Sequence, residues 1–450
     1  MMEAVSVTGS NIKQLDVEKI LPVTVMSQDA MQLRNALTAT DMLMALPQVT
    51  GLAALESRSA SAGPRGDYAS ISLRDLGSSS ALILINGRRI APHGMSGSLT
   101  ANVNQLPNQG ISQIEVLRDG ASAIYGSDAI AGVVNYVMKT DYRGANLKMR
   151  FNSPELGFNG MSADVTLTHG MDFANGRGRA LTTFNSLYRE AIWLKNTIYP
   201  DANHTDIAPP PFNIAGGAFD TRGTVTTWPT FRVGTSATTN YFYMRSGVPT
   251  LTTTAPTRAG NPDFYYNVNQ DTMASPRTRR ENIFSRIEYD LTDNITAFAD
   301  LSFYKADSTT VRQPISVNAP TSDLAVPMSI DNPFNPYGSR FFEVNGAPNA
   351  DGTPRIKGTP QVTTLLSQEI ADLPADRINV SSGTYRVVGG LKGKLTDNWN
   401  WETGFLYTRS ISVDKAPNNV RETRFLAANQ RNGISAQSDP RYAAEAGAFN

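Results

Sequence analysis

A two-residue alternation of apolar and polar side chains recurs through the second part of the chain and limits its possible folds more than any other feature. In 145–151, "ANLKMRF", Ala145, Leu147, Met149 and Phe151 alternate with Asn146, Lys148 and Arg150. Similar runs occupy 162–170, 282–291, 295–304, 384–395 and 399–407, with a weaker one at 179–188. Because successive side chains of a strand point to opposite faces, these runs predict strands with one apolar and one polar face.

The connections between these predicted strands alternate between short and long. Short connections are "ANGRGR" at 174–179 and the repeated "LTDN" at 291–294 and 395–398, whereas 190–281 and 308–382 are long. Short turns on one rim and long loops on the other are typical of bacterial outer-membrane barrels. A soluble β-sandwich would more often have modest loops at both ends. The pattern therefore favours transmembrane strands with one apolar face toward lipid.

Residues before about 140 predict a smaller domain of mixed α and β structure. Strands are expected at 20–26, 71–76, 114–116 and 133–137, and a hairpin at 81–90. The Asn86-Gly87 dipeptide between β-prone runs is a strong hairpin signal. Short helices are expected over 28–33 and over 41–46, where the helix ends before Pro47.

The string Ile114–Lys139, "IEVLRDGASAIYGSDAIAGVVNYVMK", resembles the end of the plug domain of TonB-dependent outer-membrane receptors. This resemblance implies a mainly β chain. A small α+β plug over 13–140 would precede antiparallel transmembrane β-barrel strands over 141–450, about seven of them with long extracellular loops. Family barrels have about 22 strands, so we expect the barrel to be incomplete here and its C-terminal strands, like an export signal, to lie outside this sequence.

The resemblance also implies the roles of particular residues. An extended segment over 1–12 is similar to the TonB box, which adds a strand to a partner sheet. The residues that match the box are Glu3, Val5, Val7 and Thr8. The expected plug–barrel contacts are Arg74, Arg88, Arg89, Glu115, Arg118 and Asp119. The expected ligand-contacting apices are Arg65, Tyr68, His93 and Met95, although 56–68 and 91–101 are equally compatible with ordinary solvated loops.

The function implied is TonB-dependent uptake of a scarce nutrient, such as a siderophore, cobalamin or carbohydrate, across the bacterial outer membrane. The expected partners are the TonB protein of the inner membrane, outer-membrane lipid and the small-molecule ligand. The ligand itself cannot be predicted, because one scaffold serves many functions. The alternative is a soluble, secreted β-rich binding or adhesion protein, whose apolar strand faces would be buried between two sheets.

Composition argues against several other classes of function. The chain has 40 basic and 40 acidic residues among 450, so no net positive charge favours nucleic acid. It contains no cysteine, and His93, His169 and His204 lack metal-ligand spacing. We therefore predict no cofactor, no metal and no catalysis, since nothing positions a carboxylate pair for hydrolysis.

Overall fold

The computed structural model describes nineteen stretches of the chain. They are 23–27, 43, 46–47, 49, 66–94, 100–106, 110–153, 160–197, 200–214, 217–222, 228–234, 241–245, 248–252, 266–312, 314, 316–318, 326–369, 375–396 and 399–418. The described residues fall into two compact units. The first comprises 1–192, 273–310 and 378–415, and the second 193–272, 311–377 and 416–450. No helix within the described stretches has the length and apolar character that a membrane crossing requires.

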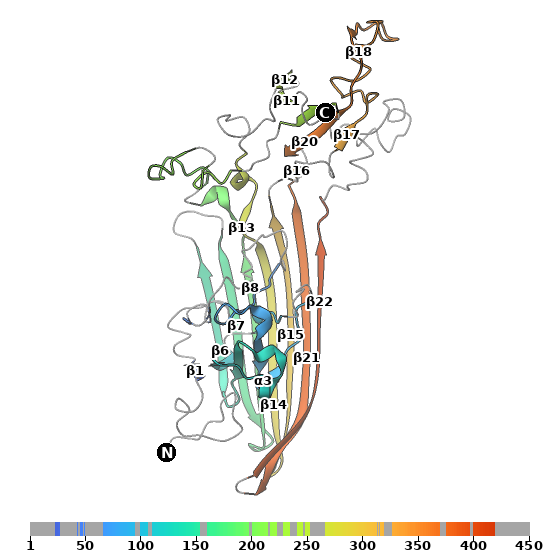
Figure 1. Cartoon of the computed structure of the whole chain (residues 1–450). Helices are drawn as coiled ribbons and strands as arrows, with labels where there is room; N and C mark the ends of the chain where they lie inside the picture. The colour runs from blue at the N-terminus through green and yellow to red at the C-terminus, as the bar shows by residue number, and fades with distance from the viewer. Residues whose placement is uncertain are drawn as a thin grey trace. The chain divides into compact units, whose positions relative to one another are not determined.

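The chain is mainly β, and its largest sheet contains all seven predicted alternating strands. These are β6 (Gly144–Asn152), β7 (Ser162–Phe173), β8 (Gly178–Arg189), β14 (Arg277–Thr292), β15 (Ile295–Val311), β21 (Arg377–Thr396) and β22 (Trp399–Lys415). The sheet order is β22-β21-β15-β14-β8-β7-β6, so neighbours in the sheet follow their order in the sequence (Figure 1). Every register determined between these neighbours is antiparallel. The strand predictions are thus confirmed.

The connections also follow the predicted alternation. β7 and β8 are joined by a turn over 174–177, in which Ala174, Asn175 and Gly176 adopt positive φ. β14 and β15 are joined at 293–294. Within the third short connection, 397–398 lies outside the described residues. The two long connections supply most of the second unit.

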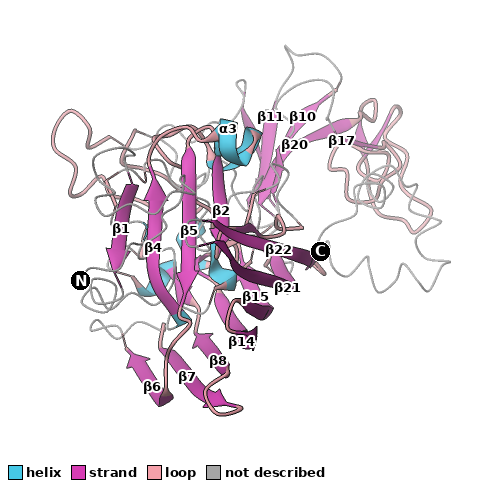
Figure 2. Cartoon of the chain, turned by 90° about the horizontal axis from the view of Figure 1, so that it is seen from below, coloured by secondary structure: helices cyan, strands magenta, loops and turns pink. Residues whose placement is uncertain are grey.

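A five-stranded sheet is the centre of the smaller domain. Its strands are β1 (Val23–Ser27), β2 (Ala81–Ile85), β3 (Arg88–Arg89), β4 (Ile111–Leu117) and β5 (Gly132–Met138), in the order β1-β4-β5-β2-β3. The hairpin of β2 and β3 turns at Asn86 and Gly87, both with positive φ, as the dipeptide predicts. Short helical segments α3 (Ser122–Tyr125) and η5 (Ser127–Ala129) lie between β4 and β5. Figure 2 shows this sheet within the arc of the seven long strands.

Both faces of the five-stranded sheet are covered, which explains the uninterrupted apolar run "ALILI" of β2. On one face Ile83 and Ile85 belong to a cluster of buried residues that also contains Leu43 and Leu46. On the other face Leu82 and Leu84 pack with a second cluster. Phe284 of β14 belongs to the first cluster, so the long-stranded sheet contributes to the core of the smaller domain.

The strand expected over 71–76 is wrong. Leu73 forms only an isolated bridge with Val49, and the next two residues, Arg74 and Asp75, have φ of 52° and 59°. Two successive left-handed residues turn the chain out of an extended conformation. Arg74 instead donates from Nη2 to the carbonyl of Ala131 at 3.1 Å. The expected helix over 28–33 and most of 41–46 lie outside the described residues.

The second unit contains a six-stranded sheet of its own. Its strands are β10 (Thr230–Val233), β11 (Tyr241–Arg245), β12 (Val248–Thr252), β16 (Ser316–Asn318), β17 (Val326–Met328) and β20 (Thr363–Glu369). The remaining short elements of the two units are η2 (Ser78–Ser80), η3 (Val103–Gln105), β9 (Ile192–Trp193), η6 (Leu194–Asn196), η8 (Val268–Gln270), β13 (Met273–Ser275), β18 (Phe342–Glu343) and β19 (Ile356–Lys357). Buried Asn335 fastens the loop over 326–362 by donating to the carbonyls of Ser329 and Gln361.

Candidate functional site: the polar contact between the smaller domain and the long strands

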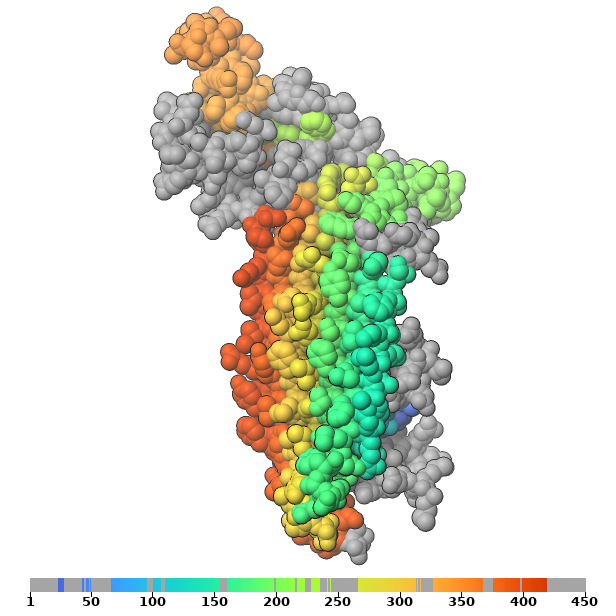
Figure 3. Space-filling model, turned by 180° about the vertical axis from the view of Figure 1, so that it is seen from behind, coloured from blue at the N-terminus to red at the C-terminus, as the bar shows by residue number. Residues whose placement is uncertain are grey.

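The two faces of the seven-stranded sheet have opposite character, and the polar face is the buried one. On β14 and β15, Arg280, Asn282, Glu288 and Asp300 are each no more than 4 % exposed. Outward positions carry apolar side chains that remain exposed, including Leu301 at 44 %. Figure 3 shows the outward face, where the long strands lie side by side and form the surface. This arrangement reverses the usual partition of a soluble protein, in which apolar side chains are the buried ones.

The first polar contact between the smaller domain and the long strands is centred on Asp67. We name Asp67, Asn102, Arg280 and Tyr304 the Asp67 cluster. Arg280 of β14 donates to both carboxylate oxygens of Asp67, with Nε 2.6 Å from Oδ2. The Tyr304 hydroxyl of β15 lies 2.8 Å from the same Oδ2. Asn102 donates from Nδ2 to the carbonyl of Asp67 and to the Tyr304 hydroxyl, at 2.8 and 3.1 Å.

The Asp67 cluster is enclosed. The Asp67 side chain is fully buried and that of Arg280 is 4 % exposed. Two opposite charges removed from water are tolerated only with good geometry and further hydrogen bonds, and the bidentate contact and the tyrosine hydroxyl provide both. Loss of one partner would leave a buried, unpaired charge. The cluster therefore binds the smaller domain to two strands that lie more than two hundred residues away in the sequence.

The second contact follows the β2–β3 turn. Asn86 donates from Nδ2 to Asp300 Oδ2 at 3.3 Å, and Asp300 also accepts from Arg286 at 3.1 Å. Arg286 pairs with Glu288 at 2.7 Å, and Lys392 of β21 donates to the same Glu288 oxygen. The turn is thus held by a network of alternating charges on the inward faces of three long strands. Such networks are rigid when every member has a partner.

Two arginines extend this second contact. Arg88 pairs with Glu402 of β22, and its guanidinium carbon lies 4.9 Å from the centre of the Phe298 ring. Arg386, which is 2 % exposed, donates to the carbonyl oxygens of Ile85 and Arg89 at 3.3 and 3.4 Å. A guanidinium suits this position because its fork of donors can reach several backbone and side-chain acceptors at once.

The third contact is centred on His93, which is 4 % exposed. Its Nε2 atom lies 3.3 Å from the hydroxyl of Ser382 and 3.2 Å from that of Ser412. The Tyr68 ring lies 4.7 Å from the imidazole, centre to centre. Burial disfavours the charged imidazolium and lowers the pKa of His93 from 6.5 to about 4. At neutral pH the ring is therefore uncharged.

The structure separates the residues predicted to make plug–barrel contacts. Arg88 lies against the long strands, as described above. Arg74 pairs with Asp119 at 3.4 Å, and both belong to the smaller domain. Arg89 pairs with Asp128, also in that domain, and this contact lowers the pKa of Asp128.

Glu115 is 1 % exposed and accepts hydrogen bonds from Gln113 and Asn135, its neighbours in the five-stranded sheet. Arg118 directly follows β4 and is exposed, as is the next residue, Asp119. Of the six predicted residues, Arg88 thus contacts the long strands, through Glu402 and Phe298.

The predicted ligand-contacting residues are only partly described. Tyr68 and His93 are buried and contact each other. Arg65 and Met95, like the TonB-box positions Glu3, Val5, Val7 and Thr8, lie outside the described residues. Within the described stretches, no group of three histidine, aspartate or glutamate side chains is placed to hold a metal ion.

Sequence reasoning missed Asp67, Arg280 and Tyr304. Asp67 lies in a loop by composition, and nothing local distinguishes it from other loop carboxylates. The available signal was on the long strands, where charged residues on the inward face must find partners once buried. That signal identifies Arg280 as needing a partner but does not identify which one.

Comparison with known proteins places the smaller domain in a family. A family model described as "TonB-dependent Receptor Plug Domain" matches residues 16–133. Among similar solved structures, the ferric enterobactin receptor of Pseudomonas aeruginosa is 13 % identical, with a TM-score of 0.39 over 88 % of this chain and 50 % of its own.

Two further structures come from Acinetobacter baumannii. The ferric preacinetobactin receptor is 11 % identical, with a TM-score of 0.42 over 90 % of this chain and 48 % of its own. The siderophore receptor PirA is 14 % identical, with a TM-score of 0.38 over 90 % and 50 %. The chain spans about half the length of these three proteins.

Proposed function

We propose that this chain, which belongs to the TonB-dependent receptors through its plug domain, takes up a scarce small-molecule nutrient across the bacterial outer membrane. We assign a TonB-box segment to 1–12, the plug to 13–140 and barrel strands with extracellular loops to 141–450. The family is one of transport receptors, and the substrate is carried without chemical change. The energy for release comes from TonB, the partner protein of the inner membrane.

The observation that carries this proposal is the reversed polarity of the seven-stranded sheet. The outward positions of β14 from Ile283 to Leu291, which are apolar except for Ser285, span about 26 Å of strand at about 3.3 Å per residue. A strand tilt of about 40° reduces this length to about 20 Å across the membrane, close to the apolar band of about 25 Å in outer-membrane barrels. The apolar face therefore suits the hydrocarbon layer.

The polar nature of the plug contacts supports a plug that can move. Side chains such as Asp67, Asn86 and His93 meet the long strands through ion pairs and hydrogen bonds. Water can replace such bonds as the plug shifts, whereas an apolar contact of the same area would lose its burial without replacement. A polar contact is thus suited to reversible opening under force.

We assign recognition of TonB to Glu3, Val5, Val7 and Thr8. An extended segment of this kind binds by adding an edge strand to the partner sheet, so its backbone hydrogen bonds provide most of the affinity. We assign ligand contact to the plug apices that carry Arg65, Tyr68, His93 and Met95. Because Tyr68 and His93 are buried, they reach a ligand only when the plug moves.

Membrane insertion tests the proposal. The full 450-residue chain is expected to be monodisperse in detergent, to insert into vesicles and to precipitate when detergent is removed. Leu301→Arg places a charge within the apolar band and should weaken insertion by about 2–4 kcal/mol. The control Glu281→Arg, on the same outward face but beyond the apolar band, should cost about 1 kcal/mol or less.

A chain that is monodisperse and cooperatively folded without detergent would overturn the proposal and favour the soluble, secreted binding protein. Equal effects of Leu301→Arg and Glu281→Arg would equally contradict the assignment of a lipid-facing band.

A further inference from the structure

The outward face of the long-stranded sheet changes character toward the long connections. On β14 the outward positions change from Ile283 to Glu281, Arg279 and Arg277. On β15, Phe303 is followed by Lys305 and Asp307 at the next outward positions. These changes occur at one level, because Ile283 is paired with Phe303 and Glu281 with Lys305.

An aromatic row marks the same level. Phe184 of β8 is paired with Ile283, and the Phe303 ring lies 5.3 Å from that of Tyr385 on β21, centre to centre. Aromatic side chains at the margin of an apolar band are typical of the interface between hydrocarbon and headgroups. The charged positions immediately beyond this row therefore lie at the level of the headgroups, on the premise of the proposed function.

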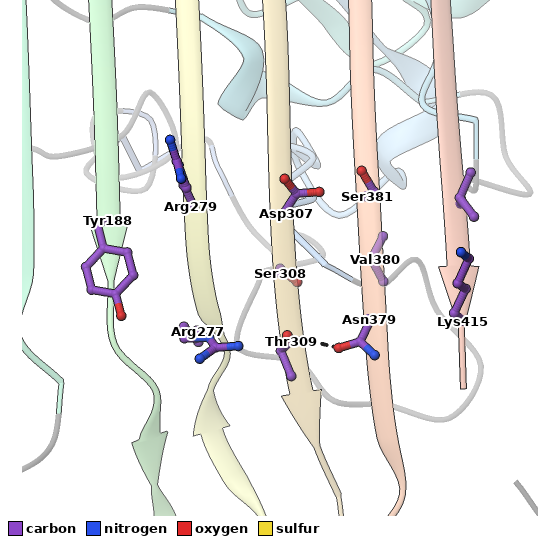
Figure 4. A pocket seen from close by; sticks show the side chains of 11 residues that line it. Tyr188, Arg277, Arg279, Asp307, Ser308, Thr309, Asn379, Val380, Ser381 and Lys415 are labelled. Carbon is purple, nitrogen blue, oxygen red and sulfur yellow. Dashed lines mark hydrogen bonds between the residues drawn. The ribbon is translucent and has the colours of Figure 1, made fainter. Parts of the chain in front are cut away.

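A hollow of about 600 Å³ lies at this level on the outward face. It is lined by Tyr188, Arg277, Arg279, Asp307, Ser308, Thr309, Asn379, Val380, Ser381, Val413 and Lys415. These residues belong to β8, β14, β15, β21 and β22, which are neighbours in the sheet, and Figure 4 shows their side chains. The hollow thus extends across the sheet rather than along a single strand.

The lining carries a net positive charge. Arg277, Arg279 and Lys415 face one carboxylate, that of Asp307. Arg279 pairs with Glu281 at 2.8 Å, and Lys305 lies 3.7 Å from Asp307. Among the described residues, no carboxylate forms an ion pair with Arg277 or Lys415. Two cations therefore face the hollow without a protein anion to neutralise them.

The remaining polar groups suit the oxygens of a phosphate. Ser381 presents a hydroxyl group to the hollow, whereas the hydroxyl of Thr309 already donates its proton to Asn379 Oδ1 at 3.0 Å. The arginine fork matches the geometry of phosphate oxygens. On the side of the hollow toward Ile283 and Phe303, the apolar band offers a surface for acyl chains. The two surfaces together match an amphipathic molecule with an anionic head.

We propose that this hollow is a binding site for the phosphorylated headgroup of an outer-leaflet lipid, held by Arg277, Arg279 and Lys415. The lipid lies with its acyl chains along the apolar band and its phosphate among the cations. The site lies on the outward face of the sheet, so it is separate from the plug and from the route of a transported ligand.

Native mass spectrometry of the full chain in detergent tests this site. The probe is lipid A with both phosphates, compared with the same lipid after phosphate removal. Arg277→Gln/Arg279→Gln should weaken binding of the phosphorylated lipid about 30-fold, about fivefold for each cation. Lys415→Gln, on a different strand, should weaken binding of the phosphorylated lipid about fivefold. This variant tests the site if the double variant fails to fold. The matched control Arg143→Gln/Lys394→Gln removes two exposed cations away from the hollow and should bind as the wild type does.

Equal binding of the dephosphorylated lipid, or unchanged binding by both pocket variants, would overturn the site. Displacement of the lipid by millimolar inorganic phosphate would show an anion site rather than a lipid site and would also overturn it. Insertion of the wild type into vesicles of phosphatidylcholine alone reports on the proposed function. If insertion succeeds without any preference for the phosphorylated lipid, only the lipid site fails.

Discussion

The Asp67 cluster provides the sharpest test of how the plug is held. Asp67→Asn keeps the shape of the side chain but removes the charge that pairs with the buried Arg280 guanidinium. Breaking a buried ion pair in this way costs about 3–5 kcal/mol. Because about 1.4 kcal/mol corresponds to a tenfold change in an equilibrium constant, the open form of the plug should become about 10²- to 10⁴-fold more populated.

Hydrogen exchange of the full chain in detergent measures this effect. The amides of β4 and β5 lie in the buried sheet, so the slowest of them exchange only when the plug unfolds. Their exchange in Asp67→Asn should be faster than in the wild type by the factor above. Tyr304→Phe removes one hydrogen bond to the carboxylate and should cost about 1.5–3 kcal/mol.

The matched control is Asp119→Asn. Its partner Arg74 lies at 3.4 Å, and the two side chains are 64 % and 44 % exposed. An exposed pair contributes about 0–1 kcal/mol, so exchange should change less than about fivefold. If Asp67→Asn altered exchange no more than this control does, the claim that the cluster holds the plug would be refuted.

Three further predictions concern other parts of the plug. Burial lowers the pKa of His93 from 6.5 in the unfolded chain to about 4 in the folded chain. Its contribution to stability is therefore complete above pH 6.5 and is lost as the pH falls toward 4. Between pH 7 and pH 4.5, the free energy of unfolding in urea should fall by about 2.5 kcal/mol less in His93→Gln than in the wild type. Tyr136→Phe should raise the melting temperature, because the buried Tyr136 hydroxyl has no hydrogen-bond partner among the described residues and such a group costs about 1–3 kcal/mol; a lower melting temperature would contradict this. Gly132→Ala should prevent stable folding of the plug, because a Cβ there would lie 2.3 Å from the Leu117 carbonyl oxygen and the residue has a φ of +142°. In the control Gly176→Ala the new Cβ would meet nothing within 4 Å, so the variant should lose only about 1 kcal/mol of stability. Thermal unfolding followed by circular dichroism measures both effects.

The sequence predicted the positions of the long strands well but not their lengths. The expected run over 282–291 begins within β14, which starts at Arg277, and the run over 295–304 ends well before β15 does, at Val311. The alternation is visible where one face is apolar. Toward the long connections both faces are polar, so the two-residue period of hydrophobicity disappears although the backbone pairing continues.

The sequence predicts that charged residues on the inward face must be paired, but it does not predict which residues of the plug pair with them. Inward charges such as Arg280 and Asp300 follow from strand alternation, and burial requires that they be paired. Their partners Asp67 and Asn86 lie in a loop and a turn more than two hundred residues away. Only the register of the sheet and the position of the plug bring these groups together, and neither property is encoded in a local pattern.

The wrong prediction of a strand over 71–76 has a different cause. Its composition suits a strand, but Arg74 and Asp75 adopt left-handed conformations that the tertiary contacts of the plug stabilise, including the bond from Arg74 to the Ala131 carbonyl. Non-glycine residues rarely adopt this conformation, so a reading of propensities predicts an extended chain instead.

The most direct test of the central claim is capture of the full chain in detergent by the periplasmic domain of TonB. Wild-type chain should bind, and Val7→Pro should not, because proline removes the backbone donor that strand addition requires. The control Val7→Thr keeps that donor and a β-branched side chain and should bind. Equal capture of wild type and Val7→Pro, or capture of neither, would contradict the account of energy coupling through residues 1–12.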